Sequence, residues 1–211
     1  AREVVLNEGG EHPLSVLELD ATAQAELVRD GELTAAELVD LSIAQIEKLD
    51  PQLNAVIHRH FERAREEARG ALPDGPFRGV PIVLKDLGCG HAQGDPIHWG
   101  TRFLRDADHR ATSTSHLVAR LRAAGFVVVG RTNVPVLGVW LTTEPAAYGA
   151  TRNPWDLARS CGGRSGGAEE NVGRNDSYPV HRAHFGERDG LCPADEAAGD
   201  VARRVHRAGR P

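Results

Sequence analysis

Lys85 is the residue of this chain whose position most strongly suggests chemistry. It closes a nearly continuous aliphatic run, residues 79–84, whose composition predicts a strand buried on both faces. An ammonium ion is costly to bury unpaired, so burial would lower the pKa of Lys85 and leave some neutral amine, which could act as a general base. Taken alone, the residue also allows a structural interpretation, in which the amine lies just beyond the strand end or pairs with Asp86.

A second candidate is the glycine-rich segment 160–167, in which four glycines surround Ser165. Such a segment lets the backbone pass close to a ligand and aim successive N–H groups at a developing oxyanion. Gly163, Ser165 and Gly167 also match the G-x-S-x-G nucleophile elbow, but that motif requires a preceding strand, and we expect none over residues 153–160. A phosphate-binding loop is disfavoured because Gly-Lys-Ser/Thr is missing. The remaining alternative is a flexible connection.

Possible metal ligands follow the strand that Lys85 closes. Their spacing matches no standard zinc pattern and no single helix face unites them, so we interpret them as loop residues in water. We therefore expect no bound metal and no other cofactor. These residues are Cys89, His91 and His98, with Asp106, Asp108 and His109 nearby.

The composition is that of a globular domain. Of 211 residues, 40% are hydrophobic and 26% are charged, with a formal net charge of −5, which excludes collagen, coiled coil and wholesale disorder. The chain has no apolar run long enough for a membrane helix and no large basic field, so we expect neither a membrane nor a nucleic-acid partner. Three widely spaced cysteines argue against a disulfide framework and predict a reducing, cytoplasmic location.

The first third of the chain predicts three helices. Asp20 can cap a helix over residues 21–29, and Thr34 with Glu37 has the capping-box spacing for a second helix, which we expect to end at the Asp50-Pro51 step. A third, charged helix over residues 61–69 ends at Gly70. We expect these helices to form one layer over an apolar sheet.

The sheet follows in the sequence. The strand before Lys85 is followed by an irregular loop, a helix over residues 112–124 and a second aliphatic strand over residues 126–129. We expect parallel pairing of the two strands, because strand, helix and strand in this order form a βαβ unit. The inward residues should be Val80, Ile82 and Leu84 on the first strand, Leu117, Val118 and Leu121 on the helix, and Val127 and Val129 on the second strand.

The composition changes after Gly167. Residues 168–211 contain only six Leu, Ile, Val or Phe residues against seven Arg and eight Asp or Glu, so we expect a disordered tail. The predicted organisation is an N-terminal extension over residues 1–13, a main domain over residues 14–167 and this tail.

Lys85 and the glycine-rich segment lie in a series of short motifs within residues 14–167. In order and composition these motifs resemble the amidase signature family, whose fold is of the α/β class with a mixed β-sheet layered between helices. The matching stretches are residues 79–86, 100–102, 125–133, 142–145, 153–156 and 161–167.

The resemblance implies a Lys–Ser–Ser mechanism. In this family a neutral lysine takes a proton through a bridging serine, held by an unusual cis peptide, from a second serine that attacks the amide carbonyl. Lys85 matches the lysine. Arg164 stands where the bridging serine belongs, at the first serine of the family's Gly-Gly-Ser-Ser-Gly-Gly loop, and Ser165 matches the other serine of that loop. Matches at substrate or loop positions are Thr143, Gly162, Gly163 and Gly166.

The same resemblance implies a small linear or cyclic amide as substrate and hydrolysis of a non-peptide C–N bond. A guanidinium stays protonated and cannot relay a proton, and nothing after Gly167 resembles the family's nucleophile segment, so we expect little or no activity and a truncated fold. The tail would then be an out-of-frame or unrelated terminus. The alternatives are a non-catalytic relative and a subunit of the transfer-RNA-dependent amidotransferase. An unpaired sheet edge would favour self-association.

Overall fold

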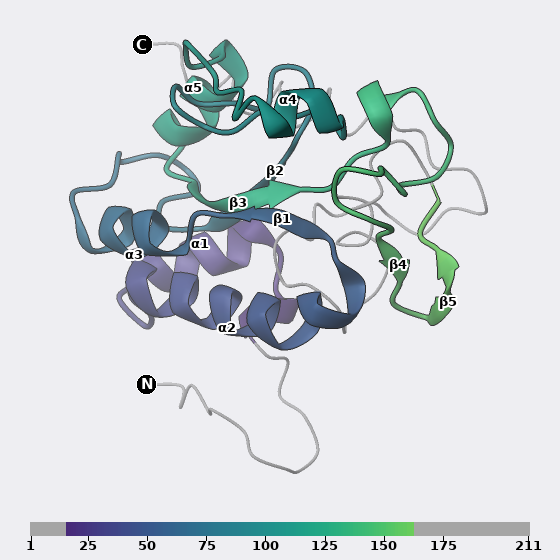
Figure 1. Cartoon of the computed structure of the whole chain (residues 1–211). Coiled ribbons are helices and arrows are strands. Elements are labelled where there is room, and N and C mark those ends of the chain that lie inside the picture. Colours follow the sequence, from purple (N-terminus) through teal and green to yellow (C-terminus); the bar gives the residue numbers. More distant parts are fainter. Residues whose placement is uncertain (1–15, 163–211) are drawn as a thin grey trace.

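A three-stranded β-sheet lies between two groups of helices in the computed structural model, which describes residues 16–162 (Figure 1). The strands, in spatial order, are β1 (Val56–Arg59), β3 (Val127–Thr132) and β2 (Pro81–Lys85). β2 runs parallel to β3, whereas β1 is antiparallel to it. The sheet is therefore mixed, and the α/β fold class expected from the sequence is confirmed.

One helical group contains α1 (Ala21–Arg29), α2 (Ala35–Leu53) and α3 (Phe61–Arg69), and the other contains α4 (Arg102–Asp106) and α5 (His116–Ala123) (Figure 1). Short 3-10 turns lie at Val16–Glu18 and Val136–Gly138. Helices α2 and α3 contact β3, and α2 also contacts β2, which confirms that the N-terminal helices pack on the sheet. The core joins apolar side chains of α2, such as Ile43 and Ile46, to valines of β3.

Local capping signals set the helix starts. Asp20 Oδ1 accepts a hydrogen bond from the Ala23 N–H at 2.8 Å, and Thr34 with Glu37 forms the complete capping box. These two predictions are confirmed. Ser115 caps α5 by accepting from the Val118 N–H at 3.2 Å.

The predicted end of α2 at Asp50-Pro51 is wrong. The helix continues through Pro51 to Leu53 and ends where Asn54 adopts a left-handed conformation. The buried carboxylate of Asp50 accepts from the N–H groups of Ala55 and Val56, at 2.7 and 2.9 Å. This contact ties the last turn to the start of β1 and offsets the cost of a proline within the helix.

The aliphatic runs at residues 80–84 and 126–129 lie side by side in one sheet, as expected. Val80 precedes β2 by one residue, and its carbonyl accepts from the Val127 N–H at 2.9 Å. Two details of the connecting helix were wrong: α5 begins at His116, and Leu117 is exposed, whereas Val118 is fully buried. Strand β1 and helix α4 were not predicted.

Residues 152–160 form a two-stranded hairpin, β4 (Arg152–Asn153) and β5 (Asp156–Ser160), so the expectation of no strand here was wrong. Most of β5 is exposed, and the apolar alternation that marks a buried strand is therefore absent from its sequence. The turn is closed locally, where Asn153 accepts from the Trp155 N–H at 2.8 Å.

The predicted extension over residues 1–13 and tail over residues 168–211 lie outside the described residues. Between residues 16 and 162, no helix is both long and apolar enough to span a membrane.

Candidate active site

Lys85 is the last residue of β2 and is partly buried. It lies opposite Thr132, the last residue of the parallel strand β3, so the two strands end at the same edge of the sheet. Ligands in α/β proteins commonly bind at this carboxyl edge, because the chain leaves the strands there in loops. The edge where Lys85 lies is therefore the candidate site.

A buried guanidinium lies directly behind Lys85. The side chain of Arg131 is fully buried, and its Nη2 donates to the Lys85 carbonyl at 3.2 Å and to the Asp86 carboxylate at 3.1 Å. Its Nη1 donates to the Gly90 carbonyl and lies 3.7 Å from the carboxylate of Asp95. One side chain of β3 thus holds the end of β2 and the loop that follows.

The two carboxylates around Arg131, those of Asp86 and Asp95, have pKa values shifted in opposite directions. Burial raises the pKa of Asp86, against the opposing effects of Arg131 and of the His98 N–H, which donates to both carboxylate oxygens at 3.2 Å. Burial alone would raise the pKa of Asp95 too, but hydrogen bonds from the Ala92 N–H and from Arg63 lower it overall. Two cations and two carboxylates therefore balance within one buried network.

His98 belongs to this network and is not a loop residue in water, which corrects the expectation from sequence. It is buried, shares a hydrogen bond with the Tyr148 hydroxyl through Nδ1, and meets the ring of His58 edge-on with centroids 5.0 Å apart. Its Nε2 has no hydrogen-bond partner among the described residues. Burial is the main cause that lowers the pKa of His98, lowers that of His58 to about 3 and raises that of Tyr148 to about 12.

Thr143 is fully buried close to the end of β3. Its carbonyl accepts from the Thr151 N–H at 2.9 Å. Asn133, the residue after β3, donates to the Thr151 hydroxyl and to the Gly149 carbonyl, each at 3.0 Å. The segment that contains Thr143 is thus joined to the carboxyl edge of the sheet.

The structure places only some of the residues expected at the site. Lys85 and Thr143 lie as described above, and Gly162 has a left-handed backbone (φ 71°) after the hairpin β4–β5. Gly163, Ser165 and Gly166 lie outside the described residues, so their geometry relative to Lys85 stays a prediction.

Sequence reasoning missed Arg131 and Tyr148, and it gave Asp86 and His98 other roles, Asp86 as an alternative partner of the Lys85 amine and His98 as a loop residue in water. One signal was available: Arg131 interrupts an otherwise apolar strand, just as Lys85 closes one. Within residues 16–162, no three side chains of His, Cys, Asp or Glu are grouped as metal ligands would be.

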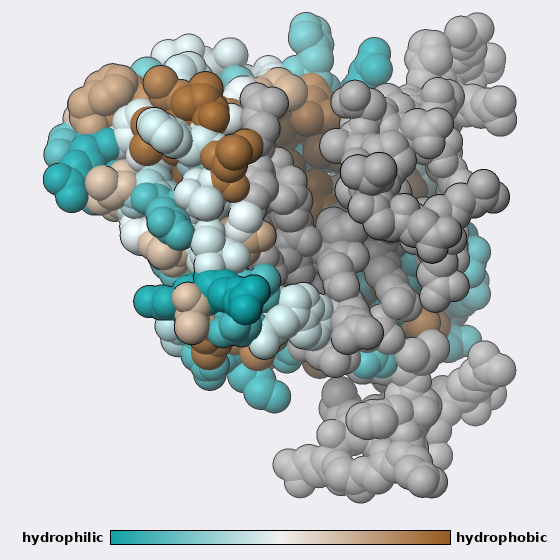
Figure 2. Space-filling view, turned by 90° about the vertical axis from the view of Figure 1, so that its right-hand side faces the viewer, coloured by the Kyte–Doolittle hydropathy of each residue, from teal (hydrophilic) through white to brown (hydrophobic). Residues whose placement is uncertain are grey.

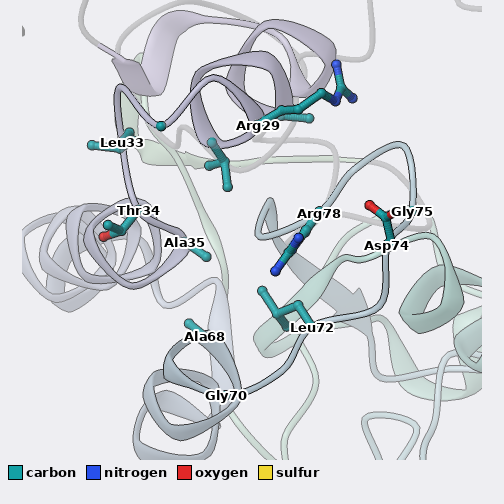
Figure 3. Close-up of a pocket in the computed structure, with 13 residues that line it drawn as sticks. Arg29, Leu33, Thr34, Ala35, Ala68, Gly70, Leu72, Asp74, Gly75 and Arg78 are labelled. Atoms are coloured by element: carbon teal, nitrogen blue, oxygen red, sulfur yellow. The ribbon is translucent and has the colours of Figure 1, made fainter.

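A cavity of about 340 Å³ lies away from this edge, between the α1–α2 corner and residues 70–78 (Figure 3). The side chain of Arg78 reaches in between Ala35 and Leu72. No residue of the network behind Lys85 lines this cavity, so it is separate from the candidate site.

Known proteins are similar to this chain over about 71% of its length. The family model described as Amidase matches residues 37–175. The 6-aminohexanoate-cyclic-dimer hydrolase of Paenarthrobacter ureafaciens is 50% identical over 149 residues, which cover 71% of this chain and 30% of that protein. One subunit of the glutamyl-tRNA(Gln) amidotransferase of Salinispora arenicola is 38% identical over 157 residues, covering 71% of this chain and 31% of that protein.

Solved structures extend the likeness to three dimensions. A 6-aminohexanoate cyclic dimer hydrolase complexed with substrate matches with a TM-score of 0.69 and 50% identity, covering 72% of this chain and 31% of that one. A bacterial aryl acylamidase matches with a TM-score of 0.66 and 34% identity, covering 73% and 33%. The chain thus spans about 30% of the length of the first curated relative.

Proposed function

Because this chain belongs to the amidase family, we propose that Lys85 is the general base of an amide-hydrolysing site and that Arg164 leaves the site with little or no turnover. The observation that carries the first part is the position of Lys85, half-buried at the carboxyl edge of the sheet in front of a buried ionic network. Partial desolvation favours the neutral amine, which is the form that accepts a proton.

The proposed substrate class is a small carboxylic amide. A relative that is 50% identical is named for hydrolysis of a cyclic dimer of 6-aminohexanoate, and a structural neighbour is an aryl acylamidase. We therefore propose linear aryl or alkyl amides and cyclic diamides as the compounds to test.

The proposed chemistry is a proton transfer through a serine pair. The nucleophile's hydroxyl proton would pass through a bridging hydroxyl to the amine of Lys85 while the nucleophile's oxygen attacks the amide carbonyl. Arg164 replaces the bridging hydroxyl with a group that is protonated at neutral pH, and Ser165 matches the loop serine that follows the bridging position. A missing general acid–base step costs about 10²–10⁴-fold in rate.

A second candidate function is that of the amidotransferase component. Its support is the identity of 38% to the Salinispora arenicola protein, with a structural match to the corresponding protein of Thermotoga maritima that has a TM-score of 0.58 and 30% identity. The hydrolase is favoured because the identity to the cyclic-dimer hydrolase is higher.

Two further properties belong to this proposal. The small number of cysteines favours a cytoplasmic location. Self-association is favoured by exposed apolar side chains between residues 136 and 160, among them Leu137, Val139 and Leu141. Hydrophobic residues gather in the upper part of the face that the space-filling view shows (Figure 2).

The activity test compares the chain with Lys85→Ala, Arg164→Ser and Arg164→Ala on aryl, alkyl and cyclic amides. Turnover of the parent should fall far below the order of 1 per second that is common for enzymes. Any residual turnover should vanish in Lys85→Ala and rise in Arg164→Ser but not in the matched Arg164→Ala. Parent turnover near 1 per second that Lys85→Ala abolishes would contradict the inactivity, and turnover that Lys85→Ala leaves intact would contradict the role of Lys85.

The role of Lys85 also has a test that needs no turnover. The chain contains only two lysines, Lys85 and the exposed Lys48, so ¹³C-labelled lysine yields two side-chain signals. The Lys85 signal should titrate below the ordinary lysine range of about 10.4, with Lys48 as the internal reference. An ordinary titration of Lys85 would remove the general-base proposal.

A further inference from the structure

We infer that Arg131 is a positioning residue that holds the main chain at Lys85, together with the loop that follows, in one fixed arrangement. The inference rests on the proposed role of Lys85. It concerns Arg131 and the loop after β2, to which that proposal assigns no function.

The first observation is the direct contact. Arg131 lies opposite Leu84 in the parallel register of β2 and β3, and its guanidinium reaches past the strand end to the Lys85 carbonyl at 3.2 Å. The Lys85 carbonyl belongs to the peptide that carries the proposed base. Its orientation helps to set the direction in which the lysine side chain leaves the strand.

The second observation is the close passage of the following loop. A Cβ atom added to Gly90 would lie 2.8 Å from the Lys85 carbonyl oxygen, so no larger residue fits there without a shift of backbone. The carbonyl of Gly90 in turn accepts from Arg131 Nη1. Arg131 therefore contacts both backbones at this crossing, and the crossing is too tight for them to move independently.

The third observation is the charge balance. Arg131 pairs with Asp86 at 3.1 Å and approaches Asp95 at 3.7 Å, while Asp95 also pairs with the partly exposed Arg63 at 2.9 Å. Only a forked guanidinium donates in several fixed directions at once, whereas an ammonium is a point charge on a flexible stem. This geometry explains why an arginine is buried beside the proposed site.

A purely structural role for Arg131 is the competing explanation. It predicts that loss of Arg131 lowers the free energy of unfolding without a specific effect at Lys85. The two explanations separate in a measurement that reports on the Lys85 side chain in folded protein.

The experiment follows the two lysine signals of the full chain, labelled with ¹³C-lysine, in four variants. Arg131→Gln/Asp86→Asn removes the buried pair as a neutral unit, because removal of one partner alone can prevent folding. Gly90→Ala keeps every charge and displaces only the crossing. The matched controls are Arg63→Gln, which alters the same network away from Lys85, and Gly88→Asn, at a left-handed glycine with nothing within 4 Å of an added Cβ.

In both test variants we expect the Lys85 titration to move by roughly half a pH unit or more and its ¹³Cε relaxation to show greater mobility, while Lys48 stays unchanged. The two controls should leave both signals as in the parent. Test variants that are folded by circular dichroism but retain the parent Lys85 titration and mobility would overturn the inference. Equal shifts in the controls would do the same, because the effect would then be general.

The general-base role of Lys85 is decided by a different measurement, the titration of Lys85 in the parent chain. If Lys85 of the parent titrates as an ordinary lysine, the general-base role fails. The positioning inference is still decided by whether the mobility of Lys85 changes in the test variants and not in the controls.

Discussion

The carboxyl edge of the sheet and the region of residues 136–160, which ends in the β4–β5 hairpin, differ in how completely the described residues cover their side chains. At the sheet edge, Arg131 is buried and forms ion pairs with two buried carboxylates, those of Asp86 and Asp95. In the second region, Trp140 is 64% exposed and Leu141 is 78% exposed. In the first region, the charged side chains find their ion-pair partners among residues 16–162. In the second region, apolar side chains are exposed because few of those residues cover them.

This difference predicts which properties residues 16–162 have without contacts from other segments. The ionic network needs only Arg131 of β3, Arg63 of α3 and the loop after β2, so we expect it to hold Lys85 without further segments. Contact of the exposed apolar side chains with another surface would remove them from water, which is favourable in free energy. Four experiments test this contrast, beginning with the largest expected effect.

Acidification should break the buried region first. Burial lowers the pKa of His58 to about 3 and that of His60 to about 4, and their common neighbours include Arg131 and Asp95. The unfolded chain therefore binds more protons than the folded chain from about pH 6.5 down to those values, so stability present at neutral pH is lost across this window.

The free energy of unfolding should fall by more than ~1 kcal/mol per pH unit for each histidine, measured by urea titration at several pH values. The variant His58→Gln should flatten this dependence. The matched change at the exposed His109, His109→Asn, should leave it as in the parent. A flat profile between pH 6.5 and 4 in the parent would contradict the assignment.

Arg131→Met should have the next largest effect. It leaves Asp86 buried beside an apolar side chain, and loss of one partner of a buried pair costs about 3–5 kcal/mol. The matched control is Arg110→Met, which breaks the exposed pair with Asp108 and should cost about 1 kcal/mol or less. Equal losses in chemical denaturation would show that the network behind Lys85 is not buried as described.

Asn133→Ala tests the link between the two regions. The variant leaves the Gly149 carbonyl and the Thr151 hydroxyl without the Asn133 amide, and an unsatisfied buried group costs about 1–3 kcal/mol. Asn153→Ala, in the exposed hairpin turn, should stay within about 0.5 kcal/mol of the parent. If the two variants unfold at the same urea concentration, the hydrogen bonds of Asn133 do not stabilise the edge.

The double change Trp140→Ser/Leu141→Ser should have the smallest effect on stability, within about 0.5 kcal/mol, because both side chains are exposed. Its effect should instead be on self-association, with a lower weight-average mass in sedimentation at high protein concentration. Leu117→Ser removes an exposed leucine from α5 and serves as the control. Unchanged association in the double variant would exclude this face as the cause.

Local sequence patterns were sufficient to predict much of the fold. The starts of α1 and α2 depend on one side chain that caps N–H groups a few residues away, and both contacts were predicted from spacing alone. The runs before Lys85 and after Gly125 could be predicted because a strand buried on both faces is apolar almost throughout. The position of Lys85 at a strand end followed from the first run.

Other features depended on residues far away in the sequence. Strand β5 has no burial pattern and exists through pairing with β4, and α2 continues past Pro51 because Asp50 is held by backbone beyond the helix. The sequence offered Asp86 only as an alternative partner of Lys85 and did not indicate Arg131, which is 45 residues from Asp86 in the sequence and hydrogen-bonded to it in the structure.

The sequence by itself determined the family, the starts of α1 and α2, the aliphatic strands and the placement of a lysine at the end of one strand. The tertiary structure alone decided what surrounds that lysine. The physical reason is that a cap or an apolar run is a local property, whereas the environment of a buried charge depends on which distant residues the sheet brings together.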